Sequence, residues 1–212
     1  MDKILFIDTL TTGMDQQRCG IYSIGGIFCI NTTEEIKEKF RFDFKIRPAE
    51  DIRINDNSLW IGGVNRTKLL SFEDEKTVLK RLTDLLDQEM NLKNPFDKIY
   101  LSGYNTSAFD APFLRYFFER NQNMNFRDYF YAQTIDIMTL STIELLGERM
   151  NMSDFHLESV ARKLGIMPES TDKYSCVENA RLCMQMFAMF KGRLGYGKNK
   201  LSEPSSTMYL NY

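Results

Sequence analysis

The first quarter of the chain has the pattern of three β-strands. Residues 3–7 form a short apolar run, and residues 20–30 have the isoleucine-rich composition of a strand. In residues 39–46, phenylalanine alternates with charged side chains, as in a strand with one buried face. The pattern therefore predicts a three-strand meander at the start of the chain.

After residue 70 the spacing of apolar residues becomes helical. A helix with one apolar and one charged face is predicted from Ser71 onward, and Ser71 and Asp74 resemble a capping pair at its start. Its apolar face consists of Phe72, Val78, Leu79, Leu82, Leu85 and Leu86. Further strands are predicted at residues 98–101 and 133–137, and further helices at residues 111–119, 138–147, 153–165 and 175–190.

This order of elements defines the expected fold class. Strands followed by alternating strands and helices predict an α/β fold, in which a central mixed β-sheet is flanked by α-helices. The length suits a single domain with one core, which we place at residues 1–190. Residues 191–212 are rich in Gly, Ser and Lys, and we expect them to form a flexible or partner-docked carboxy-terminal tail.

The composition is typical of a soluble globular protein, with 43% hydrophobic and 26% charged residues and a net charge of -2. No stretch approaches the roughly 20 apolar residues of a membrane span, and the first residues lack the features of a secretory signal. We therefore expect a cytoplasmic protein without membrane contact. The four cysteines show no CxxC spacing, which favours reduced structural thiols over zinc ligands.

Three segments, in order, distinguish the chain from a generic α/β domain. FIDTLTTG, residues 6–13, follows the first predicted strand, and GYNTSAFDAPFL, residues 103–114, leads from a strand into a helix. HLESVARKLGI, residues 156–166, is followed by KYSCVENARLCMQMF, residues 173–187. Together these segments resemble the motifs of the DnaQ-like, ribonuclease H-like family of DEDDh-type 3′→5′ exonucleases, over nearly all of residues 1–190.

The resemblance implies a two-metal hydrolysis of phosphodiester bonds. In this family four carboxylates hold two divalent ions about 3.5 to 4 Å apart, and the ions stabilise the attacking and leaving oxygens. A histidine acts as the general base toward the attacking water. Magnesium and manganese suit such a centre because they prefer hard oxygen ligands.

Only two of the five family positions keep their residues. Asp8 matches the first carboxylate and Asp110 the third, whereas Leu10 stands at the second. On the last predicted helix, YSCVENA aligns with the family pattern H-x-A-x-x-D-A, so Tyr174 stands at the histidine and Asn179 at the final aspartate. The resemblance thus implies a degenerate site that holds at most one Mg²⁺ or Mn²⁺ ion, weakly, between the two remaining aspartates.

These substitutions affect catalysis in different ways. Leu10 cannot ligate a metal, and Asn179 offers at best a neutral carbonyl oxygen. Tyr174 is a poor base because a tyrosine has an ordinary pKa of about 10. Loss of a general base alone typically costs about 10²- to 10⁴-fold in rate. Of the nearby acids, Glu178 should face elsewhere, since adjacent helix residues point about 100° apart, and Asp15 would need its loop to fold back.

The family's binding positions are also present. The resemblance implies that a cleft lined by the loop of residues 9–13, including Thr9 and Thr11, and by Tyr104, Asn105 and Phe109 contacts the terminal nucleotide. Our leading hypothesis is a pseudoexonuclease, which we define as an exonuclease fold that binds a nucleic-acid 3′ end or a protein partner without turnover.

Two rival hypotheses and several plainer interpretations stay open. The chain could be a slow, metal-dependent exonuclease on DNA or RNA, or an interaction protein that uses its last helix and tail and no nucleic acid. His156, the single histidine, is expected to have a structural or surface role. The Met- and Phe-rich residues 183–190 are expected to pack in the core.

Overall fold

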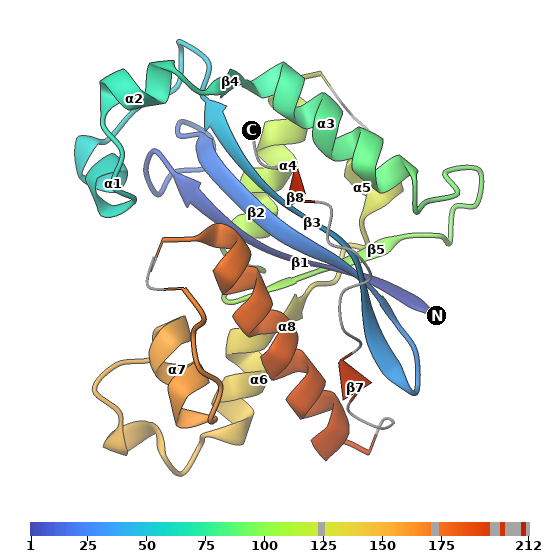
Figure 1. The fold of residues 1–212 in the computed structure, drawn as a ribbon. Helices are drawn as coiled ribbons and strands as arrows, with labels where there is room; N and C mark the ends of the chain where they lie inside the picture. Colours follow the sequence, from blue (N-terminus) through green and yellow to red (C-terminus); the bar gives the residue numbers. More distant parts are fainter. Residues whose placement is uncertain (123–125, 171–173, 196–199, 202–208, 211–212) are drawn as a thin grey trace.

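A mixed β-sheet forms the centre of the molecule in the computed structural model, which describes residues 1–122, 126–170, 174–195, 200–201 and 209–210 (Figure 1). The strands lie in the order β4-β3-β2-β1-β5-β6. Strand β2 is antiparallel to both of its neighbours, β1 and β3, whereas β4 runs parallel to β3, β5 runs parallel to β1, and β6 runs parallel to β5. Their bounds are Asp2–Thr11 for β1, Ile21–Asn31 for β2, Glu35–Arg47 for β3, Glu73–Asp74 for β4, Ile99–Gly103 for β5 and Ile135–Asp136 for β6.

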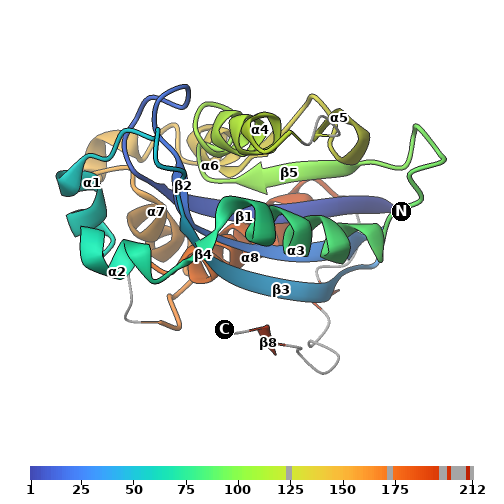
Figure 2. The same cartoon turned by 90° about the horizontal axis from the view of Figure 1, so that it is seen from above.

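Helices cover both faces of this sheet (Figures 1 and 2). Helices α3, α4 and α5 pack on one face, and α6, α7 and α8 pack on the other. The helical bounds are Asp56–Ile61 for α1, Arg66–Leu70 for α2, Glu75–Asp87 for α3, Asp110–Arg120 for α4, Phe126–Tyr129 for α5, Ile137–Glu144 for α6, Leu157–Lys163 for α7 and Cys176–Arg193 for α8, with a 3₁₀ turn at Arg149–Asn151. This arrangement confirms the predicted α/β, ribonuclease H-like fold.

The central strand β1 is buried on both sides. Leu5 and Ile7 pack into the core under α3 and α4, while Ile4 and Phe6 pack into the core under α8. Successive residues of a strand face opposite sides of a sheet, so a continuous apolar run is what a doubly covered strand requires. The short apolar run near the amino terminus is therefore the centre of both cores.

Helix α8 lies directly on the sheet at the end that carries the first motif. Its Met- and Phe-rich part is buried as predicted, with Met186 fully buried. At its first turn the contact is backbone to backbone: a Cβ atom on Gly25 of β2 would lie 2.3 Å from the amide nitrogen of Val177. Only glycine allows this approach, because real Cβ atoms do not come so close to other atoms.

Several element boundaries differ from the predicted ones for identifiable reasons. Asp74 caps α3 by accepting a hydrogen bond from the Thr77 amide, whereas Ser71 ends α2. Strand β6 is shorter than predicted, because Asp136 caps α6 and Ile137 is already helical. Helix α7 begins after His156, four residues past the start expected from Ser153.

Two short segments near the carboxy terminus pair with the outer edge of β3. They are β7, Lys200–Leu201, which pairs in parallel beside Glu35 and Ile36, and β8, Tyr209–Leu210, which pairs beside Arg41 and Phe42. The rest of the predicted tail lies partly in α8, which continues to Arg193, and partly outside the described residues. The division into a domain and a tail stays a prediction.

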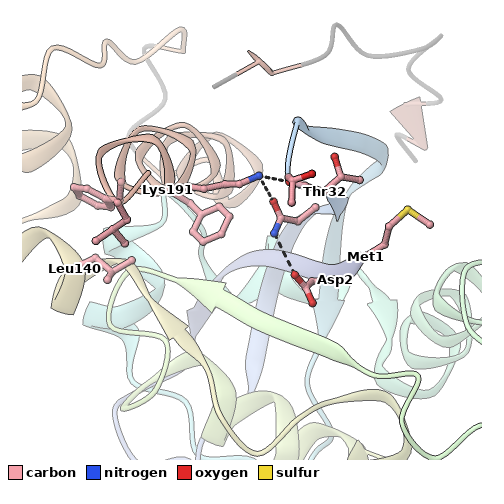
Figure 3. Close-up of a pocket in the computed structure, with 10 residues that line it drawn as sticks. Met1, Asp2, Thr32, Leu140 and Lys191 are labelled. Atoms are coloured by element: carbon pink, nitrogen blue, oxygen red, sulfur yellow. Dashed lines mark hydrogen bonds between the residues drawn. The ribbon is translucent and has the colours of Figure 1, made fainter. Parts of the chain in front are cut away.

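The cysteines are free thiols in buried positions, as predicted: Cys19, Cys29, Cys176 and Cys183. Across the described ranges, no helix has the length and apolar character needed to span a membrane. A pocket near the start of β1 and the end of α8 is lined by Met1, Asp2, Thr32, Leu140 and Lys191, among others (Figure 3). None of the five family positions lines it, because Asp8 lies near the other end of β1.

Replacing Gly25 by alanine tests how far the helix contact supports the fold. The new methyl group would meet backbone atoms of α8, so we expect Gly25→Ala to lower the free energy of unfolding by at least about 1–3 kcal/mol. Urea unfolding measures this change. The matched control is Gly147→Ala, where no atom lies within 4 Å of an added Cβ, and a change as small as the control's would contradict the account.

Candidate active site

The two retained aspartates meet where β1 ends and α4 begins. Asp8 is near the end of β1, which runs parallel to β5, and Asp110 is the first residue of α4. Because parallel strands end at the same edge of a sheet, the connection after β5 brings Asp110 next to β1. The first turn of α8 covers this edge from the other face and carries Asn179.

Asp110 is held by two threonine hydroxyls. Thr9 Oγ1 donates a hydrogen bond to Asp110 Oδ1 at 2.7 Å, and Thr106 Oγ1 donates to Oδ2 at 3.4 Å. The Asp110 side chain is nearly inaccessible, with 2% of the residue exposed. Gly103 makes room for this arrangement, since a Cβ there would lie 2.1 Å from Thr106 Oγ1.

The turn that carries Thr106 is fixed by Asp136. The carboxylate of Asp136 accepts the backbone N–H groups of Asn105 at 3.2 Å and Ser107 at 3.1 Å, and it also caps α6. Asn105 has a φ of 63°, a left-handed conformation that asparagine tolerates better than most residues. Asp136 therefore has a structural role.

Asp8 accepts a hydrogen bond from an amide. Asn179 Nδ2 lies 3.1 Å from Asp8 Oδ2, so the neutral side chain at the family's last carboxylate position donates to the first carboxylate. The Cys176 thiol also interacts with Asp8. The structure thus brings Asp8, Asp110 and Asn179 together at one site, as the motif alignment predicts.

Burial sets the charge of this pair of aspartates. Desolvation raises the pKa of Asp8 to about 6. Desolvation, together with the negative charge of Asp8, raises the pKa of Asp110 to about 8. Near neutral pH the pair therefore shares one proton and carries about one negative charge.

Leu10 belongs to a small apolar cluster beside the site. It packs with Tyr22, Leu59 and Leu69, and a Cβ on Gly62 would lie 3.1 Å from its Cδ1 atom. Leu10 follows Asp8 by two residues on the same strand, so both side chains are on one face. The side chain at the second family position therefore faces apolar neighbours.

The last helix places Tyr174 outside its own first turn. Ser175 caps α8 by accepting the amide N–H of Glu178 at 3.3 Å, and Tyr174 precedes this cap. Tyr174 is 43% exposed. Tyr174 therefore precedes the helix that carries Asn179.

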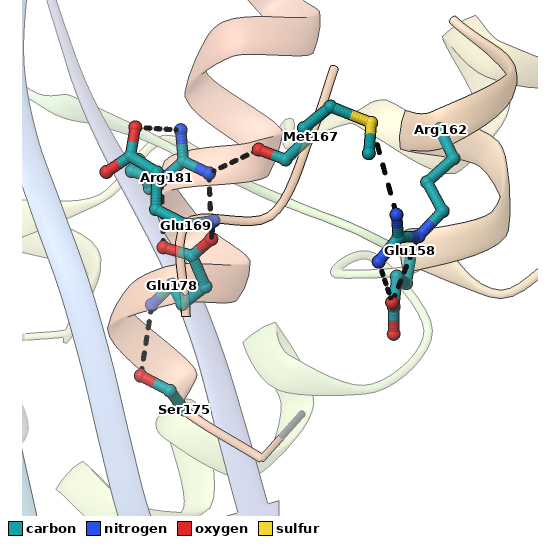
Figure 4. Close-up of polar contacts among 7 residues, drawn as sticks. All are labelled: Glu158, Arg162, Met167, Glu169, Ser175, Glu178 and Arg181. Carbon is teal, nitrogen blue, oxygen red and sulfur yellow. Dashed lines mark hydrogen bonds and ion pairs between the residues drawn. The ribbon is translucent and has the colours of Figure 1, made fainter. Parts of the chain in front are cut away.

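The other nearby acids have partners away from the aspartate pair. Glu178 pairs with Arg181 at 2.7 Å and accepts the backbone N–H of Glu169 at 2.7 Å (Figure 4). Asp15 accepts the Gln17 amide and lies 3.6 Å from Arg18. In the part of the chain that the structure describes, no three His, Cys, Asp or Glu side chains gather closely enough to hold a metal ion.

Most of the predicted binding residues already have partners within the protein. Thr9 is bonded to Asp110, and Thr11 Oγ1 donates to the Gly13 carbonyl at 2.7 Å. Tyr104 donates its hydroxyl to the Phe155 carbonyl at 2.6 Å. Phe109 packs against Phe113 with ring centroids 5.0 Å apart. Of the five residues, Asn105 alone is exposed, and the other four are buried or partly buried.

Two residues at the site were not among the predicted ones. Thr106 lies within the second motif, and its contact with Asp110 depends on the close approach at Gly103. Cys176 lies within the third motif at a position where the family pattern has alanine. His156 is not part of the site: its side chain is 87% exposed at the start of α7, which confirms a surface position.

Comparison with protein families identifies the class of this chain. The family model described as Exonuclease matches residues 5–171, which is most of the sequence, so the chain belongs to this exonuclease family. The match ends before α8, and Tyr174 and Asn179 lie outside it. No curated protein matches the chain.

Solved structures of E. coli exonuclease I share the fold. The zinc-bound form of its complex with single-stranded DNA has a TM-score of 0.71 and 19% identity, and the match covers 92% of this chain and 41% of that chain. A complex of the same enzyme with a 5cy-dT13 oligonucleotide has a TM-score of 0.70 and 17% identity, with 92% and 42% covered. This chain thus spans about two fifths of the length of the proteins it resembles.

Replacing Asp110 by asparagine tests the buried acid. The folded state raises the pKa of Asp110 above its ordinary value of 3.8 to about 8. Protonated Asp110 therefore contributes stability that is fully present below the pKa of the unfolded chain. This stability is lost as the pH rises through the pKa of the folded protein. Asparagine resembles the protonated acid and does not ionise. With a chelator present to remove divalent ions, we expect Asp110→Asn to unfold about 4–8 °C above the natural protein at about pH 9.

Near pH 4 the two proteins should unfold at about the same temperature, because the natural Asp110 is then protonated in the folded state. The matched control is Asp51→Asn, an exposed aspartate, which should leave the pH dependence unchanged. Thermal unfolding across this pH range gives the comparison. Parallel curves for the natural protein and Asp110→Asn would show that Asp110 is ionised in the fold.

Proposed function

We propose that this protein binds the 3′ end of a single-stranded nucleic acid in an exonuclease cleft and does not hydrolyse it efficiently. The observation that supports this proposal is the hydrogen bond from Asn179 Nδ2 to Asp8 Oδ2. An amide donor stands where two-metal chemistry requires a carboxylate oxygen as a ligand.

The donor set does not fit a two-ion centre. Asp8 and Asp110 offer about one negative charge near neutral pH, and Leu10 and Asn179 add none. A divalent ion would have to displace the shared proton before binding, which weakens its affinity. The two aspartates could hold at most one Mg²⁺ or Mn²⁺ ion, weakly.

General base catalysis also lacks a suitable group. Tyr174 stands at the histidine position, so the imidazole that would accept a proton from the attacking water is absent there. The alternative carboxylate of Glu178 is bound by Arg181 and by the Glu169 backbone. Because both the charged metal ligands and the general base are missing, we expect a negligible rate of phosphodiester hydrolysis.

Single-stranded nucleic acid is the ligand class that the comparisons favour. The exonuclease I structures include complexes with single-stranded DNA and with a short oligonucleotide. In this chain the corresponding edge of the sheet keeps the exposed Asn105 and the partly buried Tyr104 and Phe109. These groups offer hydrogen bonding and ring surface to a terminal nucleotide, for DNA or RNA alike.

Degradation of 3′-labelled single-stranded DNA and RNA tests the missing turnover. In Mg²⁺ and in Mn²⁺, we expect the natural protein to leave both strands intact. We expect a variant with Leu10→Glu, Tyr174→His and Asn179→Asp to trim them, because these changes restore the family's ligands and base.

The control for this assay is the same triple variant with Asp8→Ala, which should again be inert. Far-ultraviolet circular dichroism of each protein shows whether Leu10→Glu, placed in an apolar cluster, still permits folding. If the natural protein trims either strand and Asp8→Ala abolishes that activity, the proposal is wrong and the chain is an active exonuclease.

A further inference from the structure

The single tryptophan of the chain is on the surface. Trp60 is in the short helix α1 and is 81% exposed, although Leu59 beside it is 1% exposed. Ile61 and Leu70 are also exposed, at 51% and 67%. We call Trp60, Ile61 and Leu70 the α1–α2 patch. Leu59 and Leu69, which precede Trp60 and Leu70, pack in one cluster, so the two helices that carry these exposed side chains adjoin. Large exposed apolar side chains on adjoining elements mark interaction sites more often than scattered single ones do.

Helix α1 stands next to the candidate active site. The backbone N–H of Asn55 donates to the Thr12 carbonyl at 2.8 Å. Gly62, just after the helix, is in contact with Leu10, which follows Asp8 by two residues, or about 7 Å along the strand. Figures 1 and 2 place α1 beside the end of β1. The helix that carries Trp60 therefore lies beside the edge of the sheet that carries the aspartates.

The segment around the patch is more basic than the rest of the chain. Residues 45–70 contain five Lys or Arg and three Asp or Glu, a net charge of +2 by difference, whereas the whole chain has -2. Arg53, Arg66 and Lys68 are exposed beside the patch. Arg66 also pairs with Asp56, so the positive charge is moderate. Such a setting favours a polyanion over a basic or neutral partner.

We propose that Trp60 is a stacking platform for a base of the single strand whose 3′ end enters the candidate site. This inference rests on the proposed function. An indole ring offers a π-face to any base without regard to sequence, and cations nearby neutralise the adjoining phosphates. The indole ring and the basic side chains both belong to the segment of α1 and α2, beside the end of the strand that carries Asp8. The ligand is a base upstream of the terminal nucleotide.

Fluorescence of the full chain measures the contact directly, because all tryptophan emission comes from Trp60. Titration with a short single-stranded oligonucleotide should quench this emission, and anisotropy of a labelled copy of the same strand measures binding in parallel. A set of strands, each with one abasic position, should show one upstream position at which quenching is lost.

Variants separate stacking from simple apolar contact. Trp60→Leu keeps an apolar side chain without a ring, and we expect its dissociation constant to rise about 5- to 150-fold. Trp60→Phe keeps a ring and should change binding much less. The matched control is Phe96→Leu. Phe96 is equally exposed at 81%. It lies just before β5, next to the start of β1, and so at the end of the sheet away from the site.

The outcomes distinguish this inference from the proposed function. Binding by anisotropy with unchanged Trp60 emission and unchanged affinity of Trp60→Leu would overturn the stacking platform and leave the proposed function standing. An equal loss of affinity in Trp60→Leu and Phe96→Leu would also overturn it. Failure of every strand to bind the natural protein would overturn both proposals.

Discussion

The close contact between the first turn of α8 and the middle of β2 is the constraint on which the rest of the site depends. At Gly25 the helix backbone approaches the sheet so closely that no side chain fits between them. This approach places Asn179 within hydrogen-bonding distance of Asp8 and brings Cys176 against the same carboxylate. A helix held farther out would leave Asp8 without its amide donor and open to water.

That packing explains why the site keeps its shape without its charge. The threonine hydroxyls and the Asn179 amide donate hydrogen bonds to the two aspartates from within the chain. Burial raises the pKa of both aspartates, and the hydrogen bonds from Asn179 and Thr9 offset only part of this effect. Under the proposed function this edge of the sheet is a binding surface, and the apolar cluster around Leu10 joins that surface to α1.

The sequence predicts the central features because their signals are local. Alternating and apolar runs predict β1, β2 and β3, and the motif order predicts the meeting of Asp8, Asp110 and Asn179. Helices α1 and α2 were missed, since residues 56–70 have little apolar periodicity and contain two glycines and two asparagines. Thr106 could not be predicted as a partner of Asp110, because that contact depends on how closely the chain approaches at Gly103. Glu178 faces away from the site, as helix geometry predicts, and its carboxylate pairs there with Arg181.

The central claim is that the cleft holds a 3′ end and leaves it intact. The most direct measurement is competition between a labelled linear oligonucleotide and unlabelled single strands of one sequence, one linear and one circular, followed by anisotropy in Mg²⁺. The account predicts that the linear strand displaces the labelled one, that the circular strand, which has no end, competes far more weakly, and that the bound strand is recovered at full length. Equal competition by the circular strand, or recovery of shortened strands, would contradict it.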